Sequence, residues 1–364
     1  MASPAPAIAG AALLRSAIAR RVFPAAVAEV GDRSGPLWSC ALGTLSFDAD
    51  APSATAGTVF DLASLTKPIA TTSVALDLAG AGHLPLDTPV ARHAPEWLGT
   101  DRERVTIADL LEHASGLSAR LLDPAPGGPR EFEHEICTMP LEYEPRTASV
   151  YSDLGFILLG FCAERAGGAS LTDQAVRIIG DVLAATAAEG DPSTFLGAAI
   201  PERLRASVAP TRPLLEDIRR GRRLVGEVHD NYAAALGGFA GHAGLFGTAG
   251  GVGAFACAVL RAARGDATLP PPLAPATVAR AVAKSRVAGS SRALGWDTML
   301  PTSSCGTRLS AAAFGHVGFT GTSLWIDPLR DRYFVLLTNR VCDGGTIGDM
   351  LEVRRAFHDA LAEL

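Results

Sequence analysis

Ser64 and Lys67, three positions apart, are the two residues of this sequence best suited to covalent chemistry. On a helix, side chains with this spacing lie on the same face. Pro68 has no N–H group and is tolerated only in a first helical turn, so the helix begins no more than about four residues before it. We therefore expect Ser64 near the helix N-terminus, where free N–H groups and the helix dipole stabilise an oxyanion. A hydroxyl there, with an amine one turn later, is the arrangement of an activated serine nucleophile.

The same spacing also has a structural explanation, in which the serine caps a helix and the lysine lies on the surface. Three further candidate site residues likewise have both a structural and a catalytic explanation. Asp153 precedes an apolar run and is expected to cap a helix, and Tyr151 just before it could be an ordinary half-buried tyrosine. His316 stands among small residues whose backbone another molecule can approach closely, although a lone histidine is more often structural.

The elements that must position these residues are helices in the middle of the chain and short strands at its two ends. The nucleophile helix is expected to end near Gly80. Further helices are expected over residues 7–22, 153–166 and 171–185 and from Thr346 to the C-terminus. Strand patterns occur at 25–30, 37–42, 313–319, 323–327 and 333–339.

Strands at both ends with helices between them predict one antiparallel sheet built from the two termini. We expect an α/β (α+β) part from residues 1–75 and 285–364, flanked by the N- and C-terminal helices, and an inserted all-α region over 76–284. Thr106 with Asp109, and Thr346 with Asp349, predict two helix-capping boxes. The several prolines and glycines predict a loop over residues 123–129, and residues 247–253 are predicted to form a glycine-rich turn before a helix.

Composition excludes several classes of protein. The 364 residues are 48% hydrophobic and carry a net charge of −6 without a basic patch, which argues against nucleic acid as a partner. No apolar run is long enough for a membrane span, and the first residues lack a basic leader, so we expect a cytoplasmic protein. The six cysteines form no C-x-x-C pairs and are expected to be free thiols.

No histidine pair has the spacing of a zinc site, so neither a metal nor another cofactor is expected. His113 and His242 stand in loop-like sequences and are expected to be structural turn residues. The run His229-Asp230-Asn231 fits either a cleft wall or a simple Asx turn.

Three motifs in order resemble those of the serine β-lactamase and penicillin-binding-protein superfamily, in particular its class C β-lactamase-like branch. They are Ser64-Leu65-Thr66-Lys67, Tyr151-Ser152-Asp153 and His316-Val317-Gly318. The flanking stretches 60–67, 110–117, 241–246 and 318–328 are also similar to that group, and the resemblance extends over residues 12–363. It implies the β-lactamase/transpeptidase-like fold, an α/β sandwich with an all-α insert.

The resemblance also implies roles for individual residues. Ser64 would be the acylated nucleophile, Lys67 the amine that assists its deprotonation, and Tyr151 the acid and base, with its phenol eased toward phenolate by cationic Lys67. The backbone N–H groups of Ser64 and of Phe319, which follows Gly318, would form the oxyanion hole. The strand over 313–319 would line the cleft and could pair with an extended substrate.

Departures from the family pattern bear on the substrate. Asp153 stands where β-lactamases of this branch have asparagine, so it cannot donate an amide hydrogen to the acyl side chain of a β-lactam. His316 replaces the usual lysine and is expected to donate weakly to a substrate carboxylate, while Val317 removes a threonine hydroxyl.

We therefore expect a serine hydrolase that acts through a Ser64 acyl-enzyme on a small ester or amide. Alternatives within the class are a D-amino-acid peptidase or carboxypeptidase, a weak β-lactamase, and an enzyme that transfers the acyl group. The alternative of another class is a non-catalytic scaffold or binding module that keeps the fold. The sequence does not reveal the oligomeric state.

Overall fold

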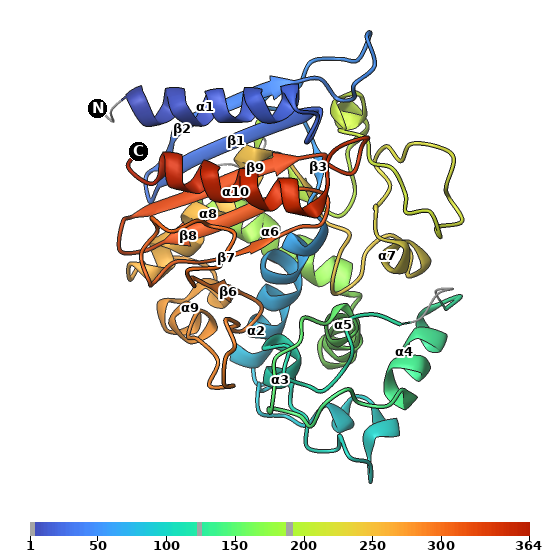
Figure 1. The fold of residues 1–364 in the computed structure, drawn as a ribbon. Coiled ribbons are helices and arrows are strands. Elements are labelled where there is room, and N and C mark those ends of the chain that lie inside the picture. The colour runs from blue at the N-terminus through green and yellow to red at the C-terminus, as the bar shows by residue number, and fades with distance from the viewer. Residues whose placement is uncertain (1–3, 122–125, 187–191) are drawn as a thin grey trace.

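The main sheet is antiparallel and has six strands in the order β2-β1-β9-β8-β7-β6. The structure is a computed structural model that describes residues 4–121, 126–186 and 192–364. Strands from the two ends of the chain meet at the β1–β9 pair, as predicted (Figure 1). The strands are β1 Ala25–Asp32, β2 Gly35–Gly43, β6 Asp297–Thr298, β7 Phe314–Val317, β8 Ser323–Asp327 and β9 Arg332–Thr338.

Both faces of this sheet are buried, which explains the nearly continuous apolar runs in its central strands. Successive side chains of a strand point to opposite faces. In β9, Phe334 and Leu336 join the core beneath α1 (Pro4–Ala19) and α10 (Ile347–Leu361), which lie side by side on one face (Figure 1). Val335 and Leu337 point the other way, into the larger core that includes α8 (Ala249–Ala263).

The middle of the chain is helical, as predicted, and extends away from the sheet (Figure 1). α8 lies inside the range 76–284 but packs against β1 and β9, so this helix covers the sheet. The other helices are α2 Ser73–Gly80, α3 Ile107–Leu111, α4 Pro129–Thr138, α5 Asp153–Gly167, α6 Leu171–Ala185, α7 Asn231–Ala235 and α9 Pro275–Ala281.

Local capping signals predicted the starts of two helices correctly and that of a third, α5, wrongly. Thr106 with Asp109 and Thr346 with Asp349 form complete capping boxes. Asp153, expected to cap α5, is instead its first residue, because the Ser152 hydroxyl accepts the Gly155 N–H. The expected glycine-rich turn over 247–253 is wrong, since α8 already begins at Ala249. Part of the expected loop over 123–129 lies outside the described residues.

A second sheet was not predicted. It joins β3 (Phe60–Asp61), β5 (Phe246–Gly247) and β4 (Leu196–Gly197), each only two residues long and therefore too short to show a period. It ties the segment just before Ser64 to a distant part of the chain.

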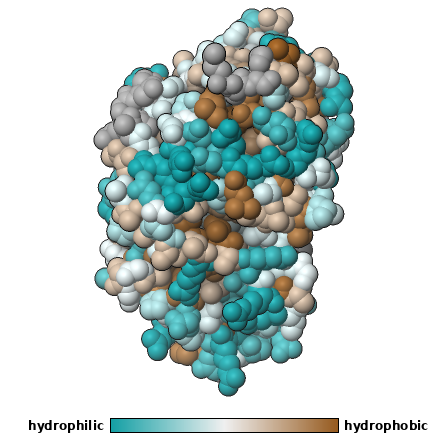
Figure 2. Space-filling view, turned by 90° about the vertical axis from the view of Figure 1, so that its left-hand side faces the viewer, coloured by the Kyte–Doolittle hydropathy of each residue, from teal (hydrophilic) through white to brown (hydrophobic). Residues whose placement is uncertain are grey.

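No single helix in the described part of the chain is long and apolar enough to cross a membrane. α5 and α6 pass that test only when taken together, and they are bent by 82° at the break between them. On the face shown in Figure 2, polar side chains form broad areas and apolar ones lie between them in small groups. The six cysteines are free thiols.

Candidate active site

Ser64 lies on a tight turn whose backbone is held under strain. The 3₁₀ turn Ala63–Leu65 leads into a π-helical segment, Lys67–Thr72, and then into α2. Ala63 has a φ of 47°, which is rare for a residue with a side chain and typical of functional sites. The Asp61 carboxylate accepts the Ala63 N–H at 2.8 Å and holds this turn, leaving Ser64 half-buried.

The ammonium of Lys67 is fully buried and has a partner for each of its three hydrogens. It donates to Ser64 Oγ at 3.1 Å, to Asp153 Oδ1 at 2.7 Å and to the His242 carbonyl oxygen at 3.2 Å. The contact with Ser64 confirms the predicted proximity of the two side chains. Burial alone would lower the pKa of Lys67, but the charge of Asp153 and the Tyr151 hydroxyl outweigh it and raise this pKa. Lys67 is therefore an ammonium ion in the resting site.

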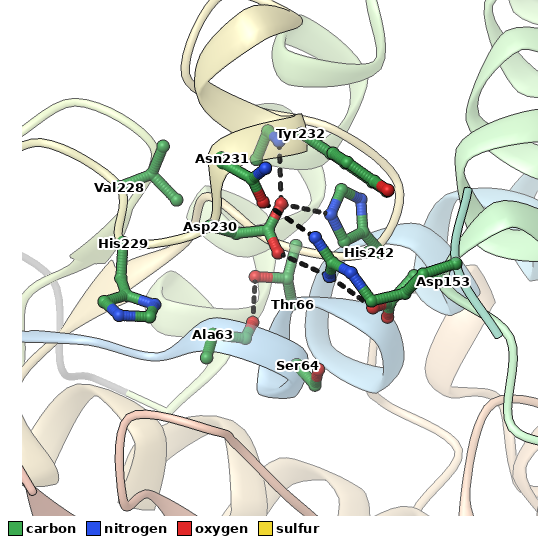
Figure 3. Close-up of polar contacts among 12 residues, drawn as sticks. Ala63, Ser64, Thr66, Asp153, Val228, His229, Asp230, Asn231, Tyr232 and His242 are labelled. Atoms are coloured by element: carbon green, nitrogen blue, oxygen red, sulfur yellow. Dashed lines mark hydrogen bonds and ion pairs between the residues drawn. The ribbon is translucent and has the colours of Figure 1, made fainter. Parts of the chain in front are cut away.

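Asp153 belongs to a chain of charges that continues away from Ser64. Its Oδ2 accepts from Arg120 at 3.1 Å, and the same nitrogen of Arg120 donates to Asp230 Oδ2 at 3.1 Å. Asp230 Oδ1 in turn lies 2.7 Å from His242 Nε2. Figure 3 shows Asp153, Asp230 and His242 converging on this network.

The buried carboxylates of this network are ionised. Burial opposes ionisation, but Lys67 and His242 lower the pKa of Asp153. His242 and Arg120 likewise hold the pKa of Asp230 well below its usual range. Asp230 also caps α7 by accepting the Ala233 N–H, which is the turn role of the two that the sequence left open.

Tyr151 interacts with the nucleophile, and its ring lies close to Lys67, Arg292 and His113. Lys67 Nζ is 4.8 Å and Arg292 Cζ is 5.1 Å from the centre of its ring, and the His113 ring is 4.6 Å away. Burial raises the pKa of Tyr151, and the charge of Asp153 adds to this against the opposing effect of Lys67. Lys67 does lower the pKa of Tyr151, as expected, but burial outweighs this effect, so the phenol is neutral in the resting site.

His113 and His242 do lie in turns, as expected, but each also supports the site. His113 Nδ1 accepts the Ser152 N–H at 3.0 Å and so holds the strand-like residues that carry Tyr151. Burial and the nearby Arg292 keep the pKa of His113 well below its usual value, so the ring is neutral and able to accept.

His316 is buried, and its contacts identify which ring nitrogen carries the proton. Nδ1 lies 2.9 Å from the Val317 carbonyl oxygen, and because a carbonyl only accepts, Nδ1 is the donor. Burial, Arg292 and Lys67 keep the pKa of His316 well below its usual value, so Nε2 has a lone pair and no hydrogen. The expectation that His316 donates to a substrate carboxylate is wrong for this tautomer.

The turn after β7 packs directly on the nucleophile segment. Thr320 Oγ1 donates to the Asp61 carbonyl at 2.7 Å, and Thr322 Oγ1 donates to the Leu62 carbonyl at 3.0 Å. A Cβ on Gly318 would lie 2.6 Å from that Leu62 oxygen, so only glycine fits here. Phe319 follows in the turn, and its N–H donates to no group among the described residues.

These elements enclose one side of a cavity of about 260 Å³. Ser64, Tyr151, His316, Gly318 and Phe319 all line it, together with Arg292, Asp297, Val317, Arg340, Ile347, Met350 and Arg354. The structure thus brings the predicted residues to one place, with Lys67 and Asp153 directly behind Ser64. β6 pairs with Phe314 and Gly315, so an extended substrate could pair only with the end of β7.

Comparison with known proteins agrees with this arrangement. A family model described as Beta-lactamase matches residues 11–351. The chain belongs to the beta-lactamase family. It is thus a serine hydrolase of that family, as expected from the three motifs.

One relative in Escherichia coli (strain K12), provisionally named a D-alanyl-D-alanine carboxypeptidase, is 31% identical over 79% of this chain and 70% of its own length. The hydrolase EstCE1, described as having promiscuous acyltransferase activity, has a similar structure, with a TM-score of 0.74 at 21% identity over 97% of this chain and 98% of its own. A class C beta lactamase from Rhodobacter sphaeroides has a TM-score of 0.73 at 20% identity, over the same shares of the two chains. These likenesses confirm the predicted β-lactamase/transpeptidase-like fold.

Sequence reasoning missed the arginines of the site. Arg120 joins two carboxylates, Arg292 lies over Tyr151, and Arg340 and Arg354 line the cavity. None of them stands in a motif, and arginines outside motifs are mostly surface residues. No local signal in the sequence distinguishes these four from the others.

Proposed function

We propose that this protein hydrolyses a small ester or amide through an acyl-enzyme on Ser64. The observation that carries the proposal is the 3.1 Å contact of Ser64 Oγ with the buried Lys67 ammonium at the edge of a cavity. A permanent cation beside the hydroxyl favours its ionised form and so lowers the barrier to attack on the substrate carbonyl.

Tyr151 is the group placed to move the proton. Its hydroxyl interacts with both Ser64 and Lys67. During attack it accepts the Ser64 proton while its own proton passes toward the leaving group, so the phenol is neutral before and after the step. In deacylation, water takes the place of Ser64 as the attacking group. Tyr151 accepts a proton from the water while its own proton returns to Ser64 Oγ, which is now the leaving group. Lys67 stays charged throughout and supplies the electrostatic stabilisation.

The oxyanion forms between two main-chain donors in this proposal. The Phe319 N–H is free among the described residues and belongs to the turn that packs on the Ser64 segment. With the Ser64 N–H it would hold the negative oxygen of the tetrahedral intermediate, a type of contact that commonly contributes about 10²–10³ in rate for each donor. The Phe319 side chain is not needed for this role.

One observation favours a second candidate, a peptidase for substrates that end in a carboxylate. Arg292 lines the cavity, and the one carboxylate that it pairs with among the described residues, that of Asp297, lies at a long 3.9 Å. An arginine binds a carboxylate through two parallel N–H groups. Arg292 could therefore take the substrate anion that neutral His316 cannot hold, as a D-amino-acid peptidase would require.

The test is covalent capture followed by mass spectrometry of the intact protein. We expect a serine-directed phosphonate to label the wild type and Ser34→Ala, which removes an exposed hydroxyl, but not Ser64→Ala. Label that persists in Ser64→Ala would overturn the proposal. Parallel incubations with p-nitrophenyl acetate, nitrocefin and D-alanine p-nitroanilide would then distinguish esterase, β-lactamase and peptidase. Product analysis with an added alcohol would reveal acyl transfer.

A further inference from the structure

The peptide between Gly318 and Phe319 is held from behind by a buried arginine. Arg354, on the inner face of α10, donates through Nη2 to the Gly318 carbonyl oxygen at 2.7 Å and to the Thr322 carbonyl oxygen at 2.9 Å. Only 7% of Arg354 is exposed, and what is exposed lines the cavity beside Ser64. One guanidinium thus joins both ends of the turn that carries Phe319.

The Gly318 carbonyl and the Phe319 N–H belong to the same peptide unit. In a trans peptide the C=O and the N–H point in opposite directions. A cation on the carbonyl side therefore leaves the N–H free on the other side. Charge-assisted hydrogen bonds are short and strong, and hydrogen bonds in series polarise one another. Arg354 thereby makes the Phe319 N–H a stronger donor and fixes the plane in which it points.

Arg340 holds the next peptide in the same manner. It donates through Nη2 to the Phe319 carbonyl oxygen at 2.6 Å and through Nη1 to the Gly345 carbonyl oxygen at 3.0 Å. The peptides on both sides of Phe319 are therefore clamped by guanidinium groups. This clamp leaves little freedom for the N–H to turn away from the cavity.

Neither arginine forms an ion pair in the part of the chain that the structure describes, and Arg354 Nε has no partner there. Burial and the neighbouring Arg340 lower the pKa of Arg354. Burying a cation without a carboxylate is costly, and an apolar side chain would pack here at lower cost. The two uncompensated charges instead place positive potential where a substrate oxygen becomes negative.

We propose that Arg354 is a positioning residue of the oxyanion hole, acting through the Gly318–Phe319 peptide. This inference rests on the proposed acyl-enzyme at Ser64. It assigns Arg354 an effect on the transition state and none on ground-state binding of a neutral ester.

The test compares Arg354→Gln and Arg354→Lys with Arg355→Gln. Arg355 is the adjacent arginine, but it donates to Ser303 and Pro301 carbonyls away from the turn. Two quantities are measured: the maximal rate and half-saturating concentration of acylation by p-nitrophenyl acetate, and the dissociation constant of phenylboronic acid, which forms an anionic tetrahedral adduct on a reactive serine.

We expect Arg354→Gln to slow maximal acylation about tenfold, less than the roughly 10²–10³ lost when an oxyanion donor itself is removed. Boronate binding should weaken by a similar factor, while the half-saturating concentration changes less than about threefold. Arg354→Lys should recover part of both losses, because one ammonium still reaches a carbonyl, and Arg355→Gln should behave as the wild type.

Several outcomes would overturn the assignment. A change in half-saturating concentration alone would make Arg354 a substrate-binding residue, and an equal loss in Arg355→Gln would mean general damage to α10. If Arg354→Gln does not fold, Arg354→Lys decides, since unchanged acylation and boronate binding in that variant contradict the proposal. A wild type that is never acylated at Ser64 refutes the proposed function as well, whereas normal wild-type acylation with unchanged variants refutes only the role of Arg354.

Discussion

Asp153 Oδ1 and Lys67 Nζ lie 2.7 Å apart, and this ion pair sets the charge directly behind the nucleophile. The lysine is fully buried, where a lone ammonium would be driven to lose its proton. The Asp153 charge opposes that loss, and Arg120 holds the aspartate from its other side. The site therefore starts the reaction with a charged lysine and a neutral tyrosine.

Substituting Asp153 by Asn should move the alkaline limb of the acylation profile to lower pH. The carboxylate raises the pKa of Lys67, so its removal lowers that pKa, and the charged lysine is lost at a lower pH. Removing an adjacent opposite charge commonly changes a pKa by about 1–3. The profile of kcat/KM for p-nitrophenyl acetate against pH measures this. Asp230→Asn, which contacts Arg120 but not Lys67, is the matched control and should shift the limb less.

Substituting Arg292 by Gln should discriminate between substrates by their charge. If Arg292 binds a substrate carboxylate, kcat/KM for mono-p-nitrophenyl succinate should fall about tenfold, equivalent to about 1.4 kcal/mol. The value for p-nitrophenyl acetate, which has no carboxylate, should change less than about threefold. Equal losses for both esters would assign Arg292 to the support of Tyr151 and would remove the argument for a peptidase.

Substituting Glu29 by Gln should stabilise the protein at neutral and higher pH but not in acid. Burial raises the pKa of Glu29 from 4.5 to about 7, and the Tyr333 hydroxyl donates to it at 2.9 Å. Because the native pKa is above the unfolded one, the protonated carboxyl favours folding fully below pH 4.5, and this contribution is lost as the pH rises through 7. The change corresponds to about 3 kcal/mol.

Urea unfolding at pH 4.5 and at pH 8 measures this effect. Glu29→Gln and the wild type should have similar free energies of unfolding at pH 4.5, and the variant should exceed the wild type by about 3 kcal/mol at pH 8. Glu103→Gln, which changes an exposed carboxylate, should follow the wild type at both pH values. A difference of the same size at both pH values would show that the effect is unrelated to ionisation.

Much of the fold was predictable because the relevant signals are local. The apolar runs over 323–327 and 333–339 predicted strands β8 and β9 closely, and the two capping boxes located the starts of α3 and α10. The strands β3, β4 and β5 were not predicted, because a strand of two residues is too short to show the alternation of apolar and polar side chains. The prediction that Asp153 caps α5 was wrong. Ser152, one residue earlier, is an equally good capping residue, and its hydroxyl accepts the N–H at the start of the helix instead.

The sequence by itself determined which residues can react and in what order they occur. The contact between Ser64 and Lys67 was predictable from the sequence, because two side chains three positions apart on a helix lie on the same face. Only the tertiary structure decided their charges. The partner of Lys67 is 86 residues away, and Arg354 contacts a carbonyl 36 residues before it. Protonation depends on burial and on such distant partners, so the neutral Tyr151, the Nδ1–H tautomer of His316 and the clamped oxyanion peptide are properties of the folded chain alone.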